Sequence, residues 1–321
     1  MVGRATGPRE MTFREHLEEL RKRLLVSLAA IMVAMFLFLM AKDRIMSIVT
    51  APYRETWAKV AESWYEDQFL RADLSKADAQ VKRDYAFIKE HWTQILSGDT
   101  EGPEFTGRNP EYLLKNFNFP LPRHLISITP LQDMVTYMIA ALIAGIVLAS
   151  PIVLHQVWAF IGAGLLDKEK RAVLAYLPFS ILLFFLGCAF GYFVMVPYAL
   201  LFLTGLTDPL VQTTLTIRDY FRFLFASTVA LGFVFQLPVI MLGLVRLGIC
   251  TPALYLKYWR HAILIMFVLG AILTPPDPVT QLLMATPMLV LFGFGLALSL
   301  MTYARMKARG LVDPPIEGEE E

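Results

Sequence analysis

Charged residues are scarce in this sequence. Only 18% of its 321 residues are Asp, Glu, Lys or Arg, whereas 56% are hydrophobic, and the formal net charge is +1. That composition is too apolar for an ordinary soluble domain. The near-neutral charge also provides no basic field to attract nucleic acid. A lipid bilayer is therefore the expected solvent, and nucleic acid is not an expected partner.

Cysteine is rare, and the motifs of common enzyme classes are missing. The two cysteines, Cys188 and Cys250, show neither CxxC nor metal-ligand spacing. The sequence contains no Walker loop, HExxH or GxSxG motif, and no GxGxxG in a strand-turn-helix context. We therefore expect no catalytic residue, no metal and no cofactor, and the chain is not expected to be an enzyme.

Long apolar runs are what the sequence does contain. A helix needs roughly 20 residues to cross about 30 Å of hydrocarbon, and these runs lack the period-2 alternation of barrel strands. The expected spans are residues 24–41, 131–158, 173–196, 219–245, 260–273 and 281–301. The predicted fold class is an all-α integral membrane bundle of six helices. Kinks are expected at Pro151, Pro178, Pro197, Pro238 and Pro287.

Basic residues are distributed unevenly between the connecting segments. They concentrate in residues 1–23, 159–172, 246–259 and 302–321. The segments 197–218 and 274–280 carry only Arg218. By the positive-inside rule the basic segments are cytoplasmic, so both termini are expected inside. The first span has no small-residue cleavage pattern after it and is expected to be an uncleaved anchor.

The polar stretch at 42–129 is far longer than a usual connection. Apolar residues recur at helical spacing from Trp57 to Trp64 and from Tyr85 to Ile95, which predicts two amphipathic helices. Residues 98–122 are rich in Gly, Pro and Asn and predict irregular chain. The stretch is expected to be an ordered extracytoplasmic helical domain. It either lies on the membrane surface with its aromatic residues in the interface, or binds a dedicated partner.

The segment before the first span predicts an amphipathic helix along the cytoplasmic surface. Thr12 and Glu15 form a capping box. The apolar stripe consists of Phe13, Leu17, Leu20 and Leu24. Spacing alone favours a local role for Glu18 and Glu19, as i,i+4 partners of Lys22 and Arg23.

Acidic residues also stand where helices are expected to begin. Asp167 can cap the third span, with Glu169 in its first turn, where the helix dipole favours a carboxylate. Asp277 can cap the sixth span, with Pro278 at the first helical position. Spacing alone favours these capping roles.

Four segments in this order resemble the TatC family, the polytopic subunit of the twin-arginine protein translocase. They are His16 to Leu24, the Ala51-Pro52 pair, Gln156 to Phe160 with Asp167 to Arg171, and Leu273 to Asp277. The resemblance covers nearly the whole chain apart from an insertion near 57–125 and the tail. A Gly162-Ala163-Gly164 run replaces the proline that usually follows the third motif.

The resemblance implies a receptor for twin-arginine signal peptides of folded cargo. Carried over by motif position, Glu19 and Glu169 would receive the arginine pair, because a carboxylate is the matching acceptor for the guanidinium fork. Leu20, Arg21 and Phe160 would belong to the same site, and Pro52 would be structural.

The resemblance also implies partners and a location. These are the single-span subunits TatA and TatB, further copies of this chain in a larger complex, and lipid of the bacterial inner membrane, with export driven by the proton-motive force. Gln236 stands where many relatives have Glu, so it can hydrogen-bond but cannot titrate. We expect a wet hollow near Gln236 and the short fifth span, with partner helices docking beside Thr274, Asp277 and Gln281.

Two other function classes fit less well. A small-solute transporter would have repeated halves meeting at a midplane site, and no convincing repeat is visible. An intramembrane enzyme would need convergent catalytic groups inside the spans, and acidic or basic residues are lacking near their midplane.

Overall fold

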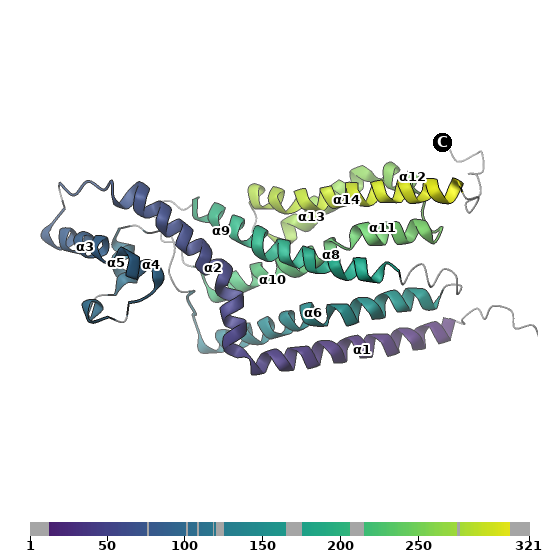
Figure 1. Cartoon of the computed structure of the whole chain (residues 1–321), viewed down its shortest axis with the longest axis horizontal. Helices are drawn as coiled ribbons and strands as arrows, with labels where there is room; N and C mark the ends of the chain where they lie inside the picture. Colours follow the sequence, from purple (N-terminus) through teal and green to yellow (C-terminus); the bar gives the residue numbers. More distant parts are fainter. Residues whose placement is uncertain are drawn as a thin grey trace, which may run out of the picture. The chain divides into compact units, whose positions relative to one another are not determined.

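The computed structural model describes residues 13–75, 77–100, 102–107, 109–117, 119, 125–164, 175–205, 215–274 and 277–308. Regular structure within these ranges is helical, apart from an isolated bridge between Ile126 and Thr216 (Figure 1). The α-helices are α1 (Phe13–Met40), α2 (Lys42–Trp64), α3 (Ala79–Glu90), α4 (Trp92–Ser97), α5 (Pro110–Asn116), α6 (Pro130–Ala163), α8 (Leu177–Phe190), α9 (Val196–Gly205), α10 (Ile217–Val234), α11 (Leu237–Arg246), α12 (Pro252–Lys257), α13 (Trp259–Leu273) and α14 (Pro278–Ala308). Short π-helical segments lie at Tyr65–Phe69 and Gly191–Met195, and a 3-10 turn at Pro103–Phe105.

The expected all-α fold is confirmed, with several long apolar helices. Five helical stretches in the described residues are long and apolar enough to cross a membrane: Arg14–Met40, Pro130–Ala163, Leu177–Leu203, Ile217–Arg246 and Pro278–Ala308. α13 is also apolar but has only 15 residues. A crossing by this sixth helix, and the inside position of both termini, stay predictions. The third helical stretch continues to Gly205, into the segment expected as a loop.

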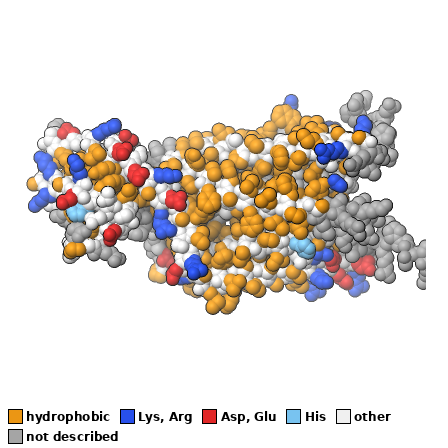
Figure 2. All heavy atoms as spheres, viewed as in Figure 1, with side chains coloured by type: hydrophobic (Ala, Val, Ile, Leu, Met, Phe, Trp, Pro, Cys, Tyr) orange, Lys and Arg blue, Asp and Glu red, His pale blue; other side chains and the backbone are white. Residues whose placement is uncertain are grey.

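The chain forms two compact units. We call residues 1–42, 138–195 and 223–321 the bundle unit, and residues 43–137 and 196–222 the insertion unit. Figure 2 shows apolar side chains covering the helices of the bundle unit, with charged ones gathered at the end where α1 begins and α14 ends. That separation is typical of helices whose sides face hydrocarbon.

The core of the bundle unit depends on close helix contact. Its buried cluster comprises Trp158, Leu183, Met195, Leu231, Phe235, Val239, Met266, Met284 and Met288. A GxxxG pattern joins Gly187 of α8 to Gly191, the first residue of the π-helical segment that follows. The neighbouring backbone of α10 leaves no room for a Cβ at either position. A Cβ built on Gly187 would lie 2.5 Å from the Leu231 carbonyl oxygen, and one on Gly191 2.7 Å from the Thr228 Cα. Small residues allow the two helices to approach closely. In a bilayer this matters because lipid tails are as apolar as the helices, so association depends on van der Waals packing rather than on the hydrophobic effect.

The five prolines expected at kinks stand in different positions of the helices. α6 and α14 continue through Pro151 and Pro287. Pro178 and Pro238 stand in the first turn of α8 and α11, where a missing N–H costs little. A π-helical segment precedes Pro197. Between α10 and α11, just before Pro238, the Gln236 amide bonds to the Phe233 carbonyl three residues earlier instead of four.

The insertion unit has an aromatic core of its own. Trp64 lies 5.1 Å from Phe119 and 6.3 Å from Trp92 between ring centroids, and Tyr65 stacks on Trp92 at 4.2 Å. The side chains of Trp57, Trp64 and Trp92 are buried inside this unit. These three side chains are therefore covered within the unit and are not available to a membrane interface, while the choice between a surface position and a dedicated partner stays a prediction. Aromatic pairs of this kind stabilise a small domain beyond the burial of their area.

Helices account for more of the insertion unit than the sequence indicates. The two expected helical regions correspond to α2 and to α3 with α4. The stretch 98–122, expected to be irregular, contains the Pro103–Phe105 turn and α5. Tyr220, at the start of α10, donates from its hydroxyl to the Val49 carbonyl at 2.8 Å. Its ring also lies 5.5 Å from that of Tyr53 between centroids. The two segments of the insertion unit, 43–137 and 196–222, are thus joined by contacts between side chains far apart in sequence.

The aromatic core predicts slow amide exchange in residues 57–97. We expect helical amides there to exchange roughly a hundredfold more slowly than in unstructured chain, equivalent to about 2.7 kcal/mol of local opening. Hydrogen–deuterium exchange of the detergent-solubilised protein measures this. Trp64→Ala is the control, and it should accelerate exchange in α3 and α4. Fast exchange throughout 57–97 in the parent would contradict an ordered unit.

Candidate functional site

α1 and α6 lie side by side in the bundle unit and approach closely (Figure 1). A Cβ built on Gly145 of α6 would lie 2.8 Å from the Met35 backbone nitrogen of α1. Ala34 is the one buried residue among those described from Arg14 to Met40. The position of α1 therefore depends on a few contacts with α6.

The cytoplasmic ends expected for these two helices are joined by side chains. His16 of α1 stacks on Phe160 of α6, with ring centroids 4.5 Å apart and an interplanar angle of 26°. Arg23 of α1 donates from Nη1 to Oε1 of Gln156 at 3.2 Å. Gln156 and Phe160 are one helical turn apart on α6. The two contacts thus fix one face of α1 against the last turns of α6.

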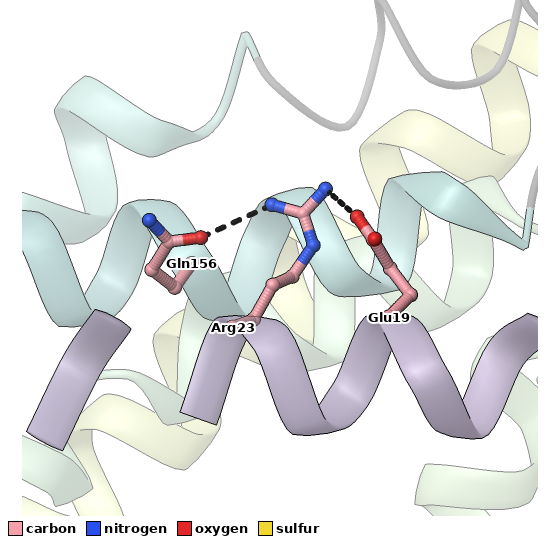
Figure 3. A network of polar contacts seen from close by, with 3 residues as sticks. All are labelled: Glu19, Arg23 and Gln156. Atoms are coloured by element: carbon pink, nitrogen blue, oxygen red, sulfur yellow. Dashed lines mark hydrogen bonds and ion pairs between the residues drawn. The ribbon is translucent and has the colours of Figure 1, made fainter. Parts of the chain in front are cut away.

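Glu19 lies on that same face, between His16 and Arg23. Its carboxylate forms an ion pair with Nη2 of Arg23, whose Nη1 is bonded to Gln156 (Figure 3). The side chains of Arg23 and Glu19 are 21% and 23% exposed, so the pair is largely shielded but still accessible. Nε of Arg23 is buried without a hydrogen-bond partner. The site thus presents a carboxylate that already binds one guanidinium.

Several expectations for the first helix can be compared with these contacts. The local pairing of Glu19 with Arg23 is confirmed, whereas Glu18 pairs with Arg14 at 3.5 Å instead of Lys22. Leu20 and Arg21, proposed for the same site, are exposed and lie away from the face that contacts α6.

Three leucines of the expected apolar stripe are exposed and do not pack on α6. Leu17, Leu20 and Leu24 are 48%, 42% and 64% exposed. The face that contacts α6 instead carries His16, Glu19 and Arg23. Their spacing at i, i+3 and i+7 could have identified this face from the sequence. The surface helix and the first span also form one unbroken helix, α1.

The second carboxylate of the expected pair, Glu169, lies outside the described residues, as do Asp167 and Thr12. The structure therefore places Glu19 and Phe160, but not Glu169.

Gln236 stands at the break between α10 and α11, and only 6% of it is exposed. Its Nε2 donates to the Ser180 carbonyl at 2.9 Å, and the Ser180 hydroxyl donates to its Oε1. Ser180 in turn accepts from Nε1 of Trp158 at 3.0 Å. This buried network joins α6, α8 and the α10–α11 break. Gln236 therefore does not face the wet hollow that we expected, because α8 satisfies its polar atoms.

Polar groups near the turn before α14 are also bonded within the chain. Thr274 donates to the Gly270 carbonyl at 2.9 Å, and Gln281 donates to the Phe267 carbonyl at 3.0 Å, which links α14 to α13. Asp277 caps α14 by accepting from the amide nitrogens of Val279 and Thr280 at 2.9 and 3.0 Å. This confirms the expected cap, with Pro278 as the first residue of the helix.

Asp277 illustrates the electrostatics of such a cap. Desolvation by itself would raise the pKa of this carboxyl, but hydrogen bonds from Thr280 and Val279 outweigh it and hold the pKa below its ordinary value. The carboxylate therefore remains charged at the helix N-terminus.

Pro52, expected to be structural, is buried inside α2. Its carbonyl accepts from the Thr56 hydroxyl at 2.7 Å.

Comparisons with known proteins agree on one family. The family model described as Sec-independent protein translocase protein (TatC) matches residues 15–287. TatCy of Bacillus subtilis (strain 168) is 36% identical over 178 residues, which are 55% of this chain and 70% of that protein. TatC of Aquifex aeolicus (strain VF5) is 37% identical over 185 residues, 57% of this chain and 77% of that protein.

A solved structure extends the similarity to the fold. The crystal structure of a twin arginine translocase receptor, TatC, superposes with a TM-score of 0.63 at 28% identity, covering 89% of this chain and 99% of that one. The relatives are components of a protein translocase and not enzymes. With the family model matching most of its length, this chain belongs to the TatC family of Sec-independent protein translocase proteins.

Proposed function

We propose that this chain is the receptor and assembly core of a twin-arginine translocase, and that it binds the arginine pair of signal peptides at its cytoplasmic face. The observation that carries the proposal is the Glu19 carboxylate, which α1 holds against α6 and which binds a guanidinium. Guanidinium is planar and permanently charged, and its donors match a carboxylate. The same chemistry would receive an arginine from another chain.

Glu169 completes the proposed site by motif position. Its segment follows α6 by a few residues, and the end of α6 carries Phe160, which is in contact with α1. Two carboxylates on separate segments would suit two adjacent arginines. Phe160 would then contribute an apolar and aromatic surface beside them, with Leu20 and Arg21 at the exposed edge.

The remaining assignments follow from charge and family. The basic segments favour a six-span arrangement in the bacterial inner membrane, with both termini in the cytoplasm. TatA-like and TatB-like single-span subunits would be recruited for export driven by the proton-motive force, and further copies of this chain would join the complex. The turn at Thr274 and Asp277 with Gln281 is the proposed docking region, although the side chains of these residues are bonded within the chain.

The test is binding of a twin-arginine peptide against a twin-lysine peptide of the same sequence. We expect the lysine peptide to bind about tenfold more weakly, because an ammonium keeps the charge but loses the forked geometry. Fluorescence anisotropy with labelled peptide and the purified, detergent-solubilised protein measures both affinities. A peptide with the arginines separated in sequence controls for net charge. Equal affinity for the arginine and lysine peptides would show that the protein recognises only their positive charge, and would contradict the proposed binding of guanidinium groups.

A further inference from the structure

Glu19, the carboxylate assigned to the cargo arginine, is already occupied by an arginine of this chain. Arg23 is placed for this by helix geometry, since it follows Glu19 by four residues on the same face. The two side chains are about four-fifths shielded, at 21% and 23% exposure. The forked contact of a peptide guanidinium, which uses both oxygens of a carboxylate, is obstructed while Arg23 holds Oε1.

Gln156 determines where the rest of Arg23 lies. Gln156 accepts a hydrogen bond from Nη1 while Glu19 accepts one from Nη2, so the guanidinium bridges α6 and α1 (Figure 3). Gln156 is a neutral acceptor and holds the guanidinium less strongly than a second carboxylate would. If the contact with Glu19 were given up, the bond to Gln156 could remain.

The arrangement satisfies Arg23 only in part. Its Nε is buried without a hydrogen-bond partner, and an unsatisfied buried donor costs free energy. The bound state of Arg23 is therefore less favourable than its two contacts suggest. A ligand that offers Glu19 better geometry can displace it.

We propose that Arg23 is a resident competitor for the cargo arginine, held by Gln156, and that it sets the affinity threshold for signal peptides. The inference rests on the proposed function of Glu19. A signal peptide binds by exchanging its arginine for Arg23 on Glu19. Every peptide must displace Arg23 before it binds Glu19, which lowers the apparent affinity of all peptides by the same factor. Peptides of low intrinsic affinity then remain unbound, whereas twin-arginine peptides still bind.

Removal of the competitor tests this directly. Arg23→Gln should tighten binding of the twin-arginine peptide by about two- to fivefold, the factor expected for an ion pair between residues four apart on a helix. Binding of the twin-lysine peptide should tighten by the same factor, because both ligands displace the same group. The ratio of the two affinities is therefore retained. A merely supporting role for Arg23 would weaken binding instead, and a direct contact with the peptide would change the ratio.

Two further variants separate displacement from other effects. Arg14→Gln removes the same charge from the same helix, but Arg14 pairs with Glu18 and both side chains are largely exposed, at 91% and 70%. Its effect should be much smaller than that of Arg23→Gln. Arg23→Lys should fall between the parent and Arg23→Gln, because an ammonium is a point charge without the fork that links Glu19 to Gln156. An equal gain from Arg14→Gln would overturn the proposal, since it would assign the effect to net charge.

Gln156→Leu provides a test that leaves Arg23 in place. Loss of this acceptor should weaken the hold on Arg23 and give a smaller gain in affinity, in the same direction as Arg23→Gln. Weaker or unchanged peptide binding in both variants would overturn the proposal. Glu19→Gln distinguishes this failure from that of the proposed function, because an unchanged affinity in Glu19→Gln would show that the peptide does not bind there at all.

Discussion

Glu19→Ala and Glu169→Ala are each expected to weaken binding of a twin-arginine peptide by about ten- to hundredfold, or on the order of 1.5 to 3 kcal/mol. Each change removes a charged acceptor from one arginine of the peptide. In Glu19→Ala the freed Arg23 also adds an unpaired cation, held by Gln156, beside an incoming cation. Peptide affinity, and export at normal membrane levels of the protein, are the measurements.

Glu18→Ala is the matched control for Glu19→Ala. Glu18 is the adjacent residue of the same type, and it too is paired with an arginine four residues away, but on the exposed face of α1. Exposed pairs of this kind contribute little, so its effect should be small. Glu19→Gln should weaken binding nearly as much as Ala, because it keeps the size and loses the charge. Unchanged affinity in both Glu19→Ala and Glu169→Ala would show that these carboxylates act only at helix ends.

Charge reversal assigns each carboxylate to an arginine. Glu19→Arg and Glu169→Arg would be measured against peptides in which the first or the second arginine is replaced by Glu. Recovery should occur only where the reversed pair meets. Recovery with neither peptide would contradict a pairwise contact.

The features that could be predicted well from the sequence are those set by residues close together in the chain. The apolar runs are helices because they satisfy their own backbone hydrogen bonds, and Asp277 with Pro278 begins α14 because both residues suit a helix N-terminus. The pairing of Glu19 with Arg23 needs only the period of a helix. Each of these features is decided by residues within about one turn of each other.

The face of α1 that packs on α6 was not predicted from the sequence, for a physical reason. A hydrophobic stripe identifies the buried face of a helix in water, because apolar side chains leave the solvent. Lipid tails are as apolar as a leucine side chain, so at a membrane small and polar residues decide which face of a helix packs on another helix. His16 and Arg23 contact α6 through stacking and a hydrogen bond, while the leucines stay exposed.

The other differences between prediction and structure arise from side-chain contacts between residues that are far apart in sequence. Gln236 was expected near a wet hollow, yet Ser180, 56 residues away in sequence, forms hydrogen bonds with its side-chain amide. One of the two interpretations of the insertion unit placed its aromatic residues in a membrane interface, yet its tryptophans pack against Phe119 and each other. No spacing rule could indicate these pairs, because each depends on how separate helices meet. The GxxxG pattern at Gly187 was a usable signal for one of those meetings, that of α8 with α10.

The close approach of α1 to α6 predicts that Gly145→Leu lowers the free energy of unfolding by about 1 to 3 kcal/mol, the usual cost of overfilling a packed contact. A Cβ on Gly145 would lie 2.8 Å from the Met35 nitrogen and 3.2 Å from the Ile31 carbonyl oxygen. Backbone atoms cannot rotate away as a side chain can, so α1 itself has to move.

Gly293→Leu in α14 is the matched control for that change. It places the same side chain in another long apolar helix, at a position where a Cβ would meet nothing within 4 Å. There the better helix propensity of Leu should leave stability unchanged or raise it by up to about 1 kcal/mol. Unfolding by SDS titration in mixed micelles compares the two variants with the parent. Because α1 carries Glu19 and Arg23 and is otherwise sparsely buried, its displacement should also reduce peptide binding, while Gly293→Leu should not. Equal stability of the two variants would mean that α1 and α6 do not meet at Gly145.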